Sequence, residues 1–324
     1  MDNEITIEPI SSITTSLWTF RVLTAAVKLN VFNVVEQIQD VKKISDELKL
    51  ELDPLERLLN TLVAMELLEK KANLYFNKPI SSKFLVKSSN AYYGDFILMN
   101  EESDNSTKAL DEVIKTGLPD TGDNRKELAR VGFTRAMHNN AQAPARVLSK
   151  LIDFNDKNHL LDIGGGSGAF SIILTNKFEN LKATVIEQPA VCITTLEYVK
   201  REGNLDKIET LEGDYFKVEF PSHDIALFGQ ILHSNSVEQN NLLLKKVYEK
   251  LEENGLVIIT EFLLNEDKTG PLFPTLFSLN MLKQTKGGRS YTFSEIKTWL
   301  ENIGFKNIEK QHLVGPHTVI IAHK

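Results

Sequence analysis

Apolar residues near the start of the chain recur at the three- and four-residue spacing of a helix. Across residues 16–38 they occupy more than one face, which predicts a helix that is buried against partners. The positions that set this spacing are Leu17, Phe20, Leu23, Ala26 and Val27.

Residues 42–81 predict a helix, a turn, a second helix and two short strands, around "LLEK" and "LYFN". We expect the second helix to begin with Asp53 as N-cap, Pro54 at the first helical position and Glu56 at the capping-box position. This order is the outline of a winged helix, which raises DNA binding as a function. A groove-reading helix should be basic, whereas this one is acidic, so an architectural role is favoured. Its charges are Glu56, Glu66 and Glu69 against Arg57 and Lys70.

The hydrophobic period changes after residue 155. Residues 91–155 predict further helices, interrupted by the turn-rich "TGLPDTGDN". Beyond them the strands "HLLDI", "ATVIE", "IETLEG", "DIALFGQIL" and "GLVIITEFLL" are separated by helical segments, except between the third and fourth. This predicts an α/β fold with a doubly wound parallel sheet, which "FKNIEKQHL" and "HTVIIAHK" close as a strand pair. We expect one domain over residues 1–150 and a second over 151–324.

Composition and charge limit the classes of partner that the protein is expected to bind. At 324 residues the chain exceeds the usual size of a single core, and its net charge of −7 opposes binding to nucleic acid or anionic membranes. No apolar run approaches the ~20 residues of a membrane span. Cys192 is the single cysteine, which excludes an internal disulfide, and the acidic start lacks the features of a signal peptide. A cytoplasmic protein without a metal site is expected.

A glycine-rich loop, "LDIGGGSGAF", follows the first strand of the sheet and opens a helix. Gly164, Gly165, Gly166 and Gly168 let the backbone turn sharply and approach a ligand at a helix N-terminus. The spacing also fits the G-x-G-x-x-A pattern of dinucleotide enzymes, so the loop alone leaves the cofactor class open. Glu187 ends the second strand in "VIEQP", where it can bind the two hydroxyls of a ribose.

The third strand is followed by "EGDYF". Here Asp214 can accept a hydrogen bond from an adenine amine, and Tyr215 can pack on the face of the base. A structural reading stays open at each position, with Gly213 and Asp214 as a helix-capping turn and Glu187 as the cap of the helix after Pro189. Three polar groups at successive carboxyl edges together favour a cofactor that contains a nucleoside.

Two histidines flank the fourth strand. His223 precedes it, at the amino edge of the sheet, and we interpret it as surface structure. His233 follows it, at the carboxyl edge near Glu187 and Asp214, which makes it the candidate general base. Glu261 ends the next strand, "VIITE", and can accept the other ring N–H and so fix the tautomer, although a buried ion pair or a cap is an open alternative.

Five segments in this order, "LDIGGGSG", "VIEQP", "EGDYF", "ILHSNS" and "GGRSYT", follow a winged-helix-like region. Together they resemble the S-adenosylmethionine-dependent class II O-methyltransferases of plants and bacterial secondary metabolism. The resemblance covers nearly the whole chain. It implies a Rossmann-like methyltransferase sheet, an N-terminal dimerisation domain that also lines the substrate pocket, and a homodimer. The implied cofactor is S-adenosylmethionine, with S-adenosylhomocysteine as its product.

Individual roles follow from the resemblance position by position. It implies that the glycine loop borders the methionine part of the cofactor, and that His233 is the base with Glu261 beside it. The segment "FTRAM" and the helix before "GGRSYT" would line the acceptor pocket, although helix core is the better reading of their apolar residues without the resemblance. The implied cofactor positions are Asp162, Gly164, Gly165, Gly166, Glu187, Gly213, Asp214 and Tyr215, and the implied substrate positions are Phe133, Met137 and Met281.

The chain departs from the family pattern in three places. It has "LHSN" where "LHDW" is usual, Gly229 where a basic residue commonly contacts the cofactor, and Ser290 where a second acid follows the glycine pair. The stretch "GPLFPTLFSLNMLKQTKGG" is rich in Leu, Phe and Met, which suits a flat aromatic acceptor such as a phenol or polyketide. We therefore expect O-methylation by in-line displacement. The alternatives are a non-methylating enzyme or binder that uses the same cofactor, and a winged-helix regulator that senses a small ligand.

Overall fold

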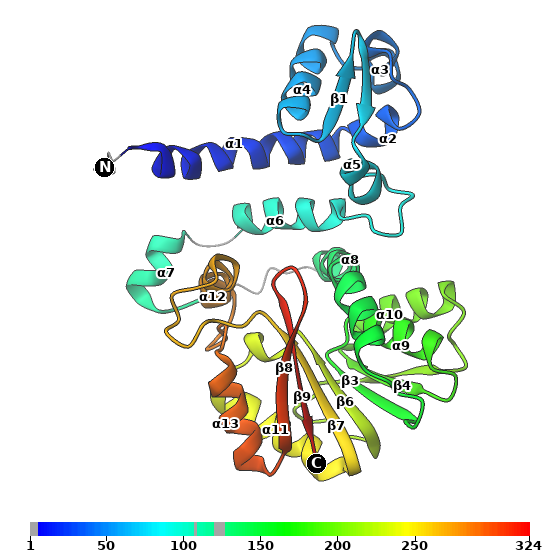
Figure 1. Ribbon diagram of the computed structural model, residues 1–324, viewed down its shortest axis with the longest axis vertical. Coiled ribbons are helices and arrows are strands. Elements are labelled where there is room, and N and C mark those ends of the chain that lie inside the picture. Colours follow the sequence, from blue (N-terminus) through cyan, green and yellow to red (C-terminus); the bar gives the residue numbers. More distant parts are fainter. Residues whose placement is uncertain (1–5, 107–108, 120–126) are drawn as a thin grey trace. The chain divides into compact units, whose positions relative to one another are not determined.

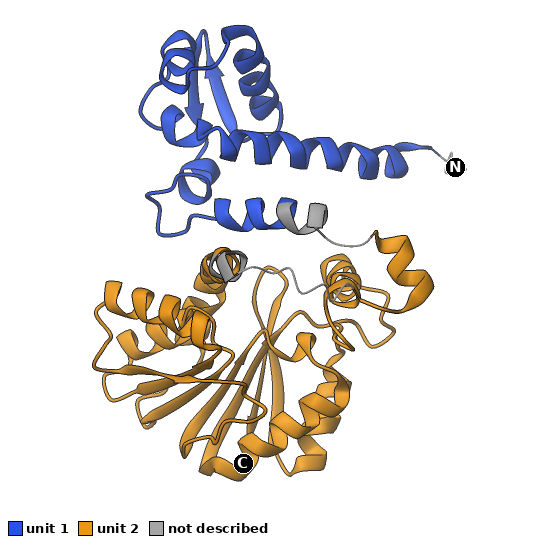
Figure 2. Cartoon of the chain, turned by 180° about the vertical axis from the view of Figure 1, so that it is seen from behind, with its two compact units in different colours: residues 1–105 blue, residues 106–324 orange. Residues whose placement is uncertain are grey.

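The computed structural model describes residues 6–106, 109–119 and 127–324. The chain divides into two compact units, Met1–Asn105 and Ser106–Lys324 (Figure 2). This division differs from the expected boundary at 150/151, since residues 106–150 group with the second unit. The reason lies in helix α8 (Glu127–Leu151), which packs on α9 (Ala169–Lys177) and α10 (Pro189–Arg201).

The first unit begins with two helices where one was expected. Helix α1 (Glu8–Lys28) ends before Asn30, whose left-handed backbone (φ 62°) breaks the helix ahead of α2 (Val31–Val35). The first half of α1 is exposed in the single chain, with Ile10, Ile13, Leu17 and Trp18 among its exposed side chains. This half of α1 therefore buries little apolar surface against its own chain.

The winged-helix order of the first unit is confirmed. Helices α3 (Val41–Leu48) and α4 (Leu52–Ala64) precede an antiparallel pair, β1 (Leu68–Lys71) and β2 (Leu74–Asn77). The predicted cap at Asp53 is wrong: Glu51 is the N-cap of α4, so Asp53 lies inside the first turn and pairs with Arg57 at 3.0 Å. Helices α5 (Pro79–Phe84) and α6 (Gly94–Ser106) complete the unit.

The second unit is built on a seven-stranded sheet with the order β5-β4-β3-β6-β7-β9-β8 (Figure 1). The first five strands run parallel and the last two are antiparallel to their neighbours. The predicted doubly wound sheet with a closing strand pair is therefore confirmed. The strands are β3 (His159–Ile163), β4 (Lys182–Glu187), β5 (Ile208–Glu212), β6 (His223–Gly229), β7 (Leu251–Glu261), β8 (Lys306–Val314) and β9 (His317–His323).

Helices cover both faces of this sheet (Figure 1). Helices α11 (Val237–Lys250) and α13 (Phe293–Ile303) share one apolar core with the sheet, and α8, α9 and α10 share the other. Because both faces are covered, the central strands contain continuous apolar runs, as in "ALF" of β6. Helices α7 (Leu110–Thr116) and α12 (Leu272–Gln284) contact each other near the carboxyl edge. In the described parts of the chain, no helix is both long and apolar enough to cross a bilayer.

Candidate active site

The carboxyl edge of the sheet holds the candidate site at its switch point. Strands β3 and β6 are neighbours, and the chain proceeds from them toward opposite ends of the sheet. Ligands of open α/β sheets bind in the crevice at such a point. The loops that follow β3 and β6 meet there, since a Cβ built on Gly164 would lie 2.4 Å from the side chain of Ile231.

The glycine loop has a backbone that other residues rarely adopt. Gly164 and Gly166 have φ of 63° and 57°, and Gly168 has φ of 72° as N-cap of α9. Gly165 is required for a different reason, because its Cβ would lie within 2.5 Å of the Asp162 carboxyl group. The loop is therefore shaped by its main chain, as a cofactor cradle at a helix N-terminus requires.

Asp162 lies fully buried beneath this loop. Its Oδ2 accepts a hydrogen bond from Ser171 at 2.7 Å, while its Oδ1 has no partner in the described chain. Burial raises the pKa of the Asp162 carboxyl to about 7, and the charge of Glu187 adds to this shift. A buried carboxyl with a spare oxygen is uncommon in a purely structural position.

Glu187 at the end of β4 bridges two loops. Its Oε1 accepts from the backbone N–H of Gly166 at 3.2 Å, and its Oε2 accepts from Gln188 at 2.8 Å. Each oxygen keeps a lone pair, so the carboxylate can still accept from the hydroxyls of a ribose. Burial raises the pKa of Glu187, in opposition to these two hydrogen bonds.

The loop after β5 is a capped turn. The Asp214 carboxylate accepts from the backbone N–H of Phe216 at 2.9 Å and pairs with Lys217 at 3.4 Å. Gly213 has φ of 142°, and a Cβ there would meet Val218 at 2.4 Å. Burial raises the pKa of Tyr215, whose hydroxyl donates to Asn235 at 3.4 Å. No helix begins directly after Asp214, so its carboxylate closes a turn and does not cap a helix. Among the described residues, its Oδ2 pairs with the exposed Lys217.

The histidine that begins β6 and the one that follows it have different surroundings. His223 is buried, so its interpretation as a surface residue is wrong, although it does lie at the amino end of the strand. Its Nδ1 lies 2.8 Å from the Pro221 carbonyl, and burial lowers the pKa of His223 to about 4. The strand ends at Gly229, three residues earlier than expected, and His233 sits in a short 3-10 turn over Leu232–Ser234.

His233 and Glu261 form a buried pair. Nδ1 of the ring lies 2.8 Å from Glu261 Oε2, and the His233 backbone N–H donates to Oε1 at 3.1 Å. A carboxylate only accepts, so Nδ1 carries the proton and Nε2 presents its lone pair. Within the described residues Nε2 has no hydrogen-bond partner, so this nitrogen is free to take a proton from a ligand.

The turn that carries His233 is fixed by its backbone. Asn240 of α11 donates to the Leu232 carbonyl at 2.9 Å, and the Tyr291 hydroxyl donates to the Asn235 carbonyl at 2.6 Å. A Cβ on Gly288 would lie 2.4 Å from the His233 carbonyl oxygen, so the glycine pair of "GGRSYT" lets this segment approach the turn. Ser290, which stands where an acid was expected, donates instead to the Pro274 carbonyl at 2.9 Å.

The chain matches a known family along most of its length. Residues 117–306 match the O-methyltransferase domain, and residues 12–87 match the O-methyltransferase dimerisation domain. The chain belongs to the O-methyltransferase family. The five motifs therefore predicted the family correctly, as S-adenosylmethionine-dependent O-methyltransferases.

Relatives with assigned reactions are similar over nearly the whole chain. A 3-hydroxy-5-methyl-1-naphthoate 3-O-methyltransferase of Streptomyces sahachiroi is 29% identical over 95% of this chain and 92% of its own. The bovine acetylserotonin O-methyltransferase is 26% identical over 94% of both chains. The human N-acetylserotonin methyltransferase, solved with S-adenosylmethionine, superposes with a TM-score of 0.88 at 23% identity, over 100% of this chain and 99% of that one. The last likeness shows the shared fold.

An aromatic cluster surrounds the His233 ring of this O-methyltransferase. The ring of Phe277 on α12 meets the imidazole edge-on at 4.8 Å, and Phe262 stacks on the imidazole at 6.1 Å. Phe262 also packs against Phe277 and Phe273 at 4.9 and 5.0 Å. We call His233, Phe262, Phe273 and Phe277 the aromatic cluster. The sequence marked the α12 region as rich in Phe but did not single out Phe262 or Phe277.

The expected substrate residues lie on two helices of the second unit. Met281 on α12 is buried one turn after Phe277, and this i, i+4 spacing is the sequence signal by which Phe277 could have been found. Phe133 and Met137 lie one turn apart on α8, where Phe133 is exposed and Met137 half-buried in this chain. Their contact with an acceptor remains a prediction.

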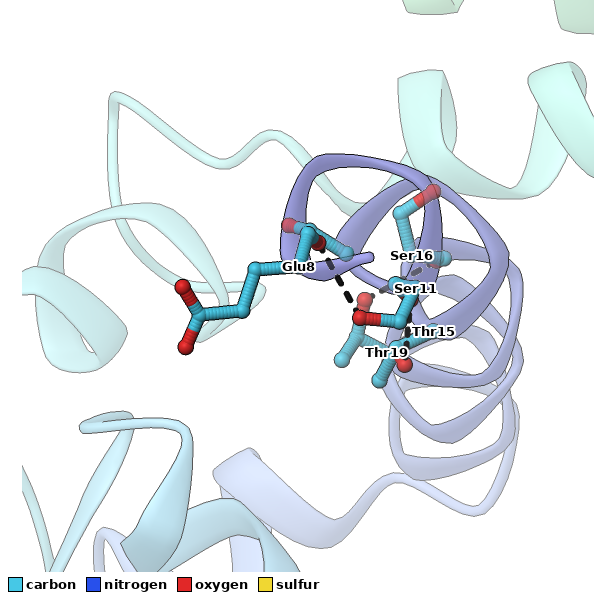
Figure 3. A pocket seen from close by; sticks show the side chains of 6 residues that line it. Glu8, Ser11, Thr15, Ser16 and Thr19 are labelled. Atoms are coloured by element: carbon cyan, nitrogen blue, oxygen red, sulfur yellow. Dashed lines mark hydrogen bonds between the residues drawn. The ribbon is translucent and has the colours of Figure 1, made fainter. Parts of the chain in front are cut away.

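A pocket in the first unit of the O-methyltransferase differs from this site, because most of the residues that line it carry hydroxyl groups. Figure 3 shows a polar pocket on α1, where the Ser11 hydroxyl donates to the Glu8 carbonyl of the same helix at 3.0 Å. Among the described residues, no group of three or more His, Cys, Asp or Glu side chains could hold a metal ion. The pocket is lined by Glu8, Ser11, Ser12, Thr15, Ser16 and Thr19, none of which the sequence predicted as a site residue.

Proposed function

We propose that this chain methylates a hydroxyl of a small aromatic metabolite, with His233 as the general base and Glu261 as its positioning partner. The observation that carries the proposal is the buried His233–Glu261 pair at 2.8 Å, which leaves Nε2 available beside an apolar aromatic cluster. Curated relatives support the acceptor class, since one acts on a hydroxynaphthoate and another in tetracenomycin polyketide synthesis.

The residues at the carboxyl edge fit S-adenosylmethionine. Glu187 would hold the ribose, the glycine loop over Asp162 would border the methionine part, and Asp214 with Tyr215 would border the adenine. The fit rests on the spare oxygen of Asp162, the remaining lone pairs of Glu187 and the glycine cradle. When bound, the cofactor supplies a methyl group that is already activated by a sulfonium.

The chain then contributes a general base and holds the acceptor in position for attack. A phenol has a pKa near ~10, so removing its proton at neutral pH costs about 4 kcal/mol, and His233 Nε2 accepts that proton while the oxygen attacks. The O–CH₃ bond forms as the S–CH₃ bond breaks. Glu261 holds the Nδ1–H and stabilises the imidazolium that results. The aromatic cluster excludes water and orients the flat acceptor, and well-oriented pairs gain ~7–11 kcal/mol from positioning.

The test is to replace His233 by alanine. Turnover with a panel of phenols should fall ~10²–10⁴-fold, while the dissociation constant of the cofactor stays within about twofold of the wild type. His312→Ala is the matched control, because His312 is exposed on β8. Unchanged turnover in His233→Ala would remove the base assignment, and weaker cofactor binding would make the histidine structural.

A second candidate is an enzyme or binder that keeps the cofactor without transferring its methyl group. Ser290 favours it, since the hydroxyl is bonded to Pro274 and adds no acid beside the His233–Glu261 pair. The two candidates separate when the wild type is incubated with a labelled methyl donor and phenols. Label in the phenol supports methyl transfer, and donor binding without label supports the second candidate.

We further propose that the first unit mediates a homodimer. The match to the dimerisation domain covers residues 12–87, and the exposed apolar side chains of α1 fall largely inside it. Light scattering on the full chain should give twice the mass of the protomer, and Ile13→Glu should lower it.

A further inference from the structure

Three neutral polar side chains form a hydrogen-bonded chain in the second unit. Asn140 Nδ2 donates to Gln230 Oε1 at 3.3 Å, and Gln230 Nε2 donates to His317 Nδ1 at 3.1 Å. They come from α8, from the loop after β6 and from the start of β9. We call Asn140, Gln230 and His317 the polar triad. The proposed methyl transfer assigns no role to any of its members.

Each member of the polar triad lies next to a residue of the candidate site in sequence or in space. Gln230 is the first residue after β6, and the next residue, Ile231, packs against the glycine loop at Gly164. The ring of His317 lies 4.9 Å from that of Phe262 in the aromatic cluster. Asn140 follows Met137 by three positions on α8, so the two share a helix face. The triad thus connects α8 and β9 to the loop that leads from β6 to His233.

The backbone of Gln230 is held in an unusual conformation. Its φ of 63° lies in the left-handed region, which glycine adopts freely and a residue with a Cβ rarely adopts. The Gln230 N–H is bonded to the Thr260 carbonyl at 3.0 Å, which fixes this conformation. Such strain is typical of ligand-binding positions, where it aims a side chain in a direction that a regular strand would not.

The triad has unused hydrogen-bond donors and carries no charge. His317 Nδ1 accepts from Gln230, so Nε2 bears the ring proton, and burial lowers the pKa of His317 to about 4. Within the described chain, the His317 Nε2–H and the second N–H of each amide have no partner. Two groups of the described chain act on His317 through their charge: the Glu261 carboxylate raises its pKa and His312 lowers it. A carboxylate ligand would therefore meet a negative charge, whereas a carbonyl oxygen would meet donors.

We propose that the polar triad binds an uncharged carbonyl group of the aromatic acceptor, such as that of a ketone, quinone or amide. The acceptor is thereby held at two points, its hydroxyl at His233 and its carbonyl at the triad. This inference rests on the proposed function, because it names the chemistry of the same acceptor. It also separates this chain from its naphthoate-methylating relative, whose named acceptor is a carboxylate.

The test compares three naphthols that differ at one position. One bears an acetyl group, one an isopropenyl group of the same shape without the oxygen, and one a carboxylate. The wild type should favour acetyl over isopropenyl by ~10²-fold or more in kcat/KM, because a site built to donate hydrogen bonds rejects an analogue that cannot accept them. In Gln230→Leu and in His317→Phe, which keeps a ring against Phe262, the ratio should approach one with unchanged cofactor affinity. His312→Phe is the control and should keep the ratio.

The outcomes distinguish this inference from the proposed function. Equal kcat/KM for acetyl and isopropenyl in the wild type, a preference for carboxylate, or a ratio that survives in both variants would overturn the role of the triad. If the wild type methylates none of the three, the proposed function has failed. Calorimetry with S-adenosylhomocysteine then measures acceptor affinity directly, and the same acetyl-to-isopropenyl comparison decides whether the triad binds a carbonyl.

Discussion

The two halves of the carboxyl edge are made differently. The half that follows β3, β4 and β5 is shaped mainly by the main chain, with glycines at positive φ and carboxylates that accept from backbone N–H groups. The half that follows β6 and β7 is shaped by side chains. Those of α11 and α12 reach the 3-10 turn, and those of α8 and β9 reach Gln230 just before it. A shared cofactor needs only the first kind of site, whereas acceptors that differ between relatives require the second.

This difference leads to separable effects of substitution. Changes in the histidine half should alter turnover and acceptor choice while cofactor affinity is preserved. Changes in the glycine half should alter cofactor affinity or stability while the His233–Glu261 pair remains intact. A substitution in one half that produced the effect expected of the other half would contradict this separation.

The largest effect is expected for Glu261→Gln. The neutral amide can donate to Nδ1 and so place the ring proton on Nε2, where it blocks proton abstraction. Turnover should fall about 10³-fold. Cofactor affinity, measured by calorimetry, should stay within about twofold, and turnover close to the wild type would exclude Glu261 as the group that orients the base.

Gly288→Ala should have the next largest effect. The added methyl group would lie 2.4 Å from the His233 carbonyl oxygen and 2.5 Å from Thr285, so the turn that carries the base must shift. A displacement near 1 Å lowers turnover ~10²-fold. Gly132→Ala is the matched control, since a Cβ there has open space. A rise in the dissociation constant of the cofactor without a loss of turnover would contradict the separation of the two halves.

The sequence predicted the glycine half better than the histidine half. Local order along the chain, strand then glycine loop then helix, was enough to place Gly164 to Gly166 and Glu187 at the carboxyl edge, because each lies at or directly after the end of its own strand. Phe277, Asn140 and His317 could not be found in this way. They lie between 44 and 93 residues from His233 in sequence, and the packing of α8, α12 and β9 brings them to His233 itself, to Phe262 or to Gln230.

Two other differences from the predicted structure, at His223 and at the start of α4, have local causes. His223 lies at the predicted edge but is covered by the segment around Pro221, which hydropathy does not reveal. The cap of α4 lies two residues before Asp53, a displacement common at helix ends.

Asp162→Asn probes the glycine half through stability. The unfolded carboxyl titrates near ~3.9 and the folded one at about 7, so the folded chain binds the extra proton between these values and stability falls as pH rises through this window. Asparagine does not ionise, so the variant does not lose stability in this way. Relative to the wild type, its free energy of unfolding should rise by about 2 kcal/mol between pH 5 and pH 7.

Urea unfolding of both proteins at each pH measures this gain for Asp162→Asn. Burial lowers the pKa of His138, His223 and His317 to about 4, so each contributes stability that is fully present above ~6.5 and is lost as the pH falls from there to about 4. This opposite trend is common to both proteins and cancels in the difference. A difference that does not change with pH would show that Asp162 is ionised in the fold throughout.

The smallest effect is expected for Lys246→Met. This residue lies on α11, the helix that contacts both halves of the carboxyl edge. Helix α11 supplies Asn240 to the His233 turn, and it also supplies Lys246, whose ammonium donates to the carbonyls of Tyr215 at 3.0 Å and of Val218. Methionine keeps the apolar stem but removes this charge-assisted bond, so the loop over Asp214 and Tyr215 should loosen. Cofactor affinity should fall about tenfold with turnover at saturation unchanged. The exposed Lys245→Met is the control, and an unaltered affinity in Lys246→Met would mean that the backbone alone determines this loop.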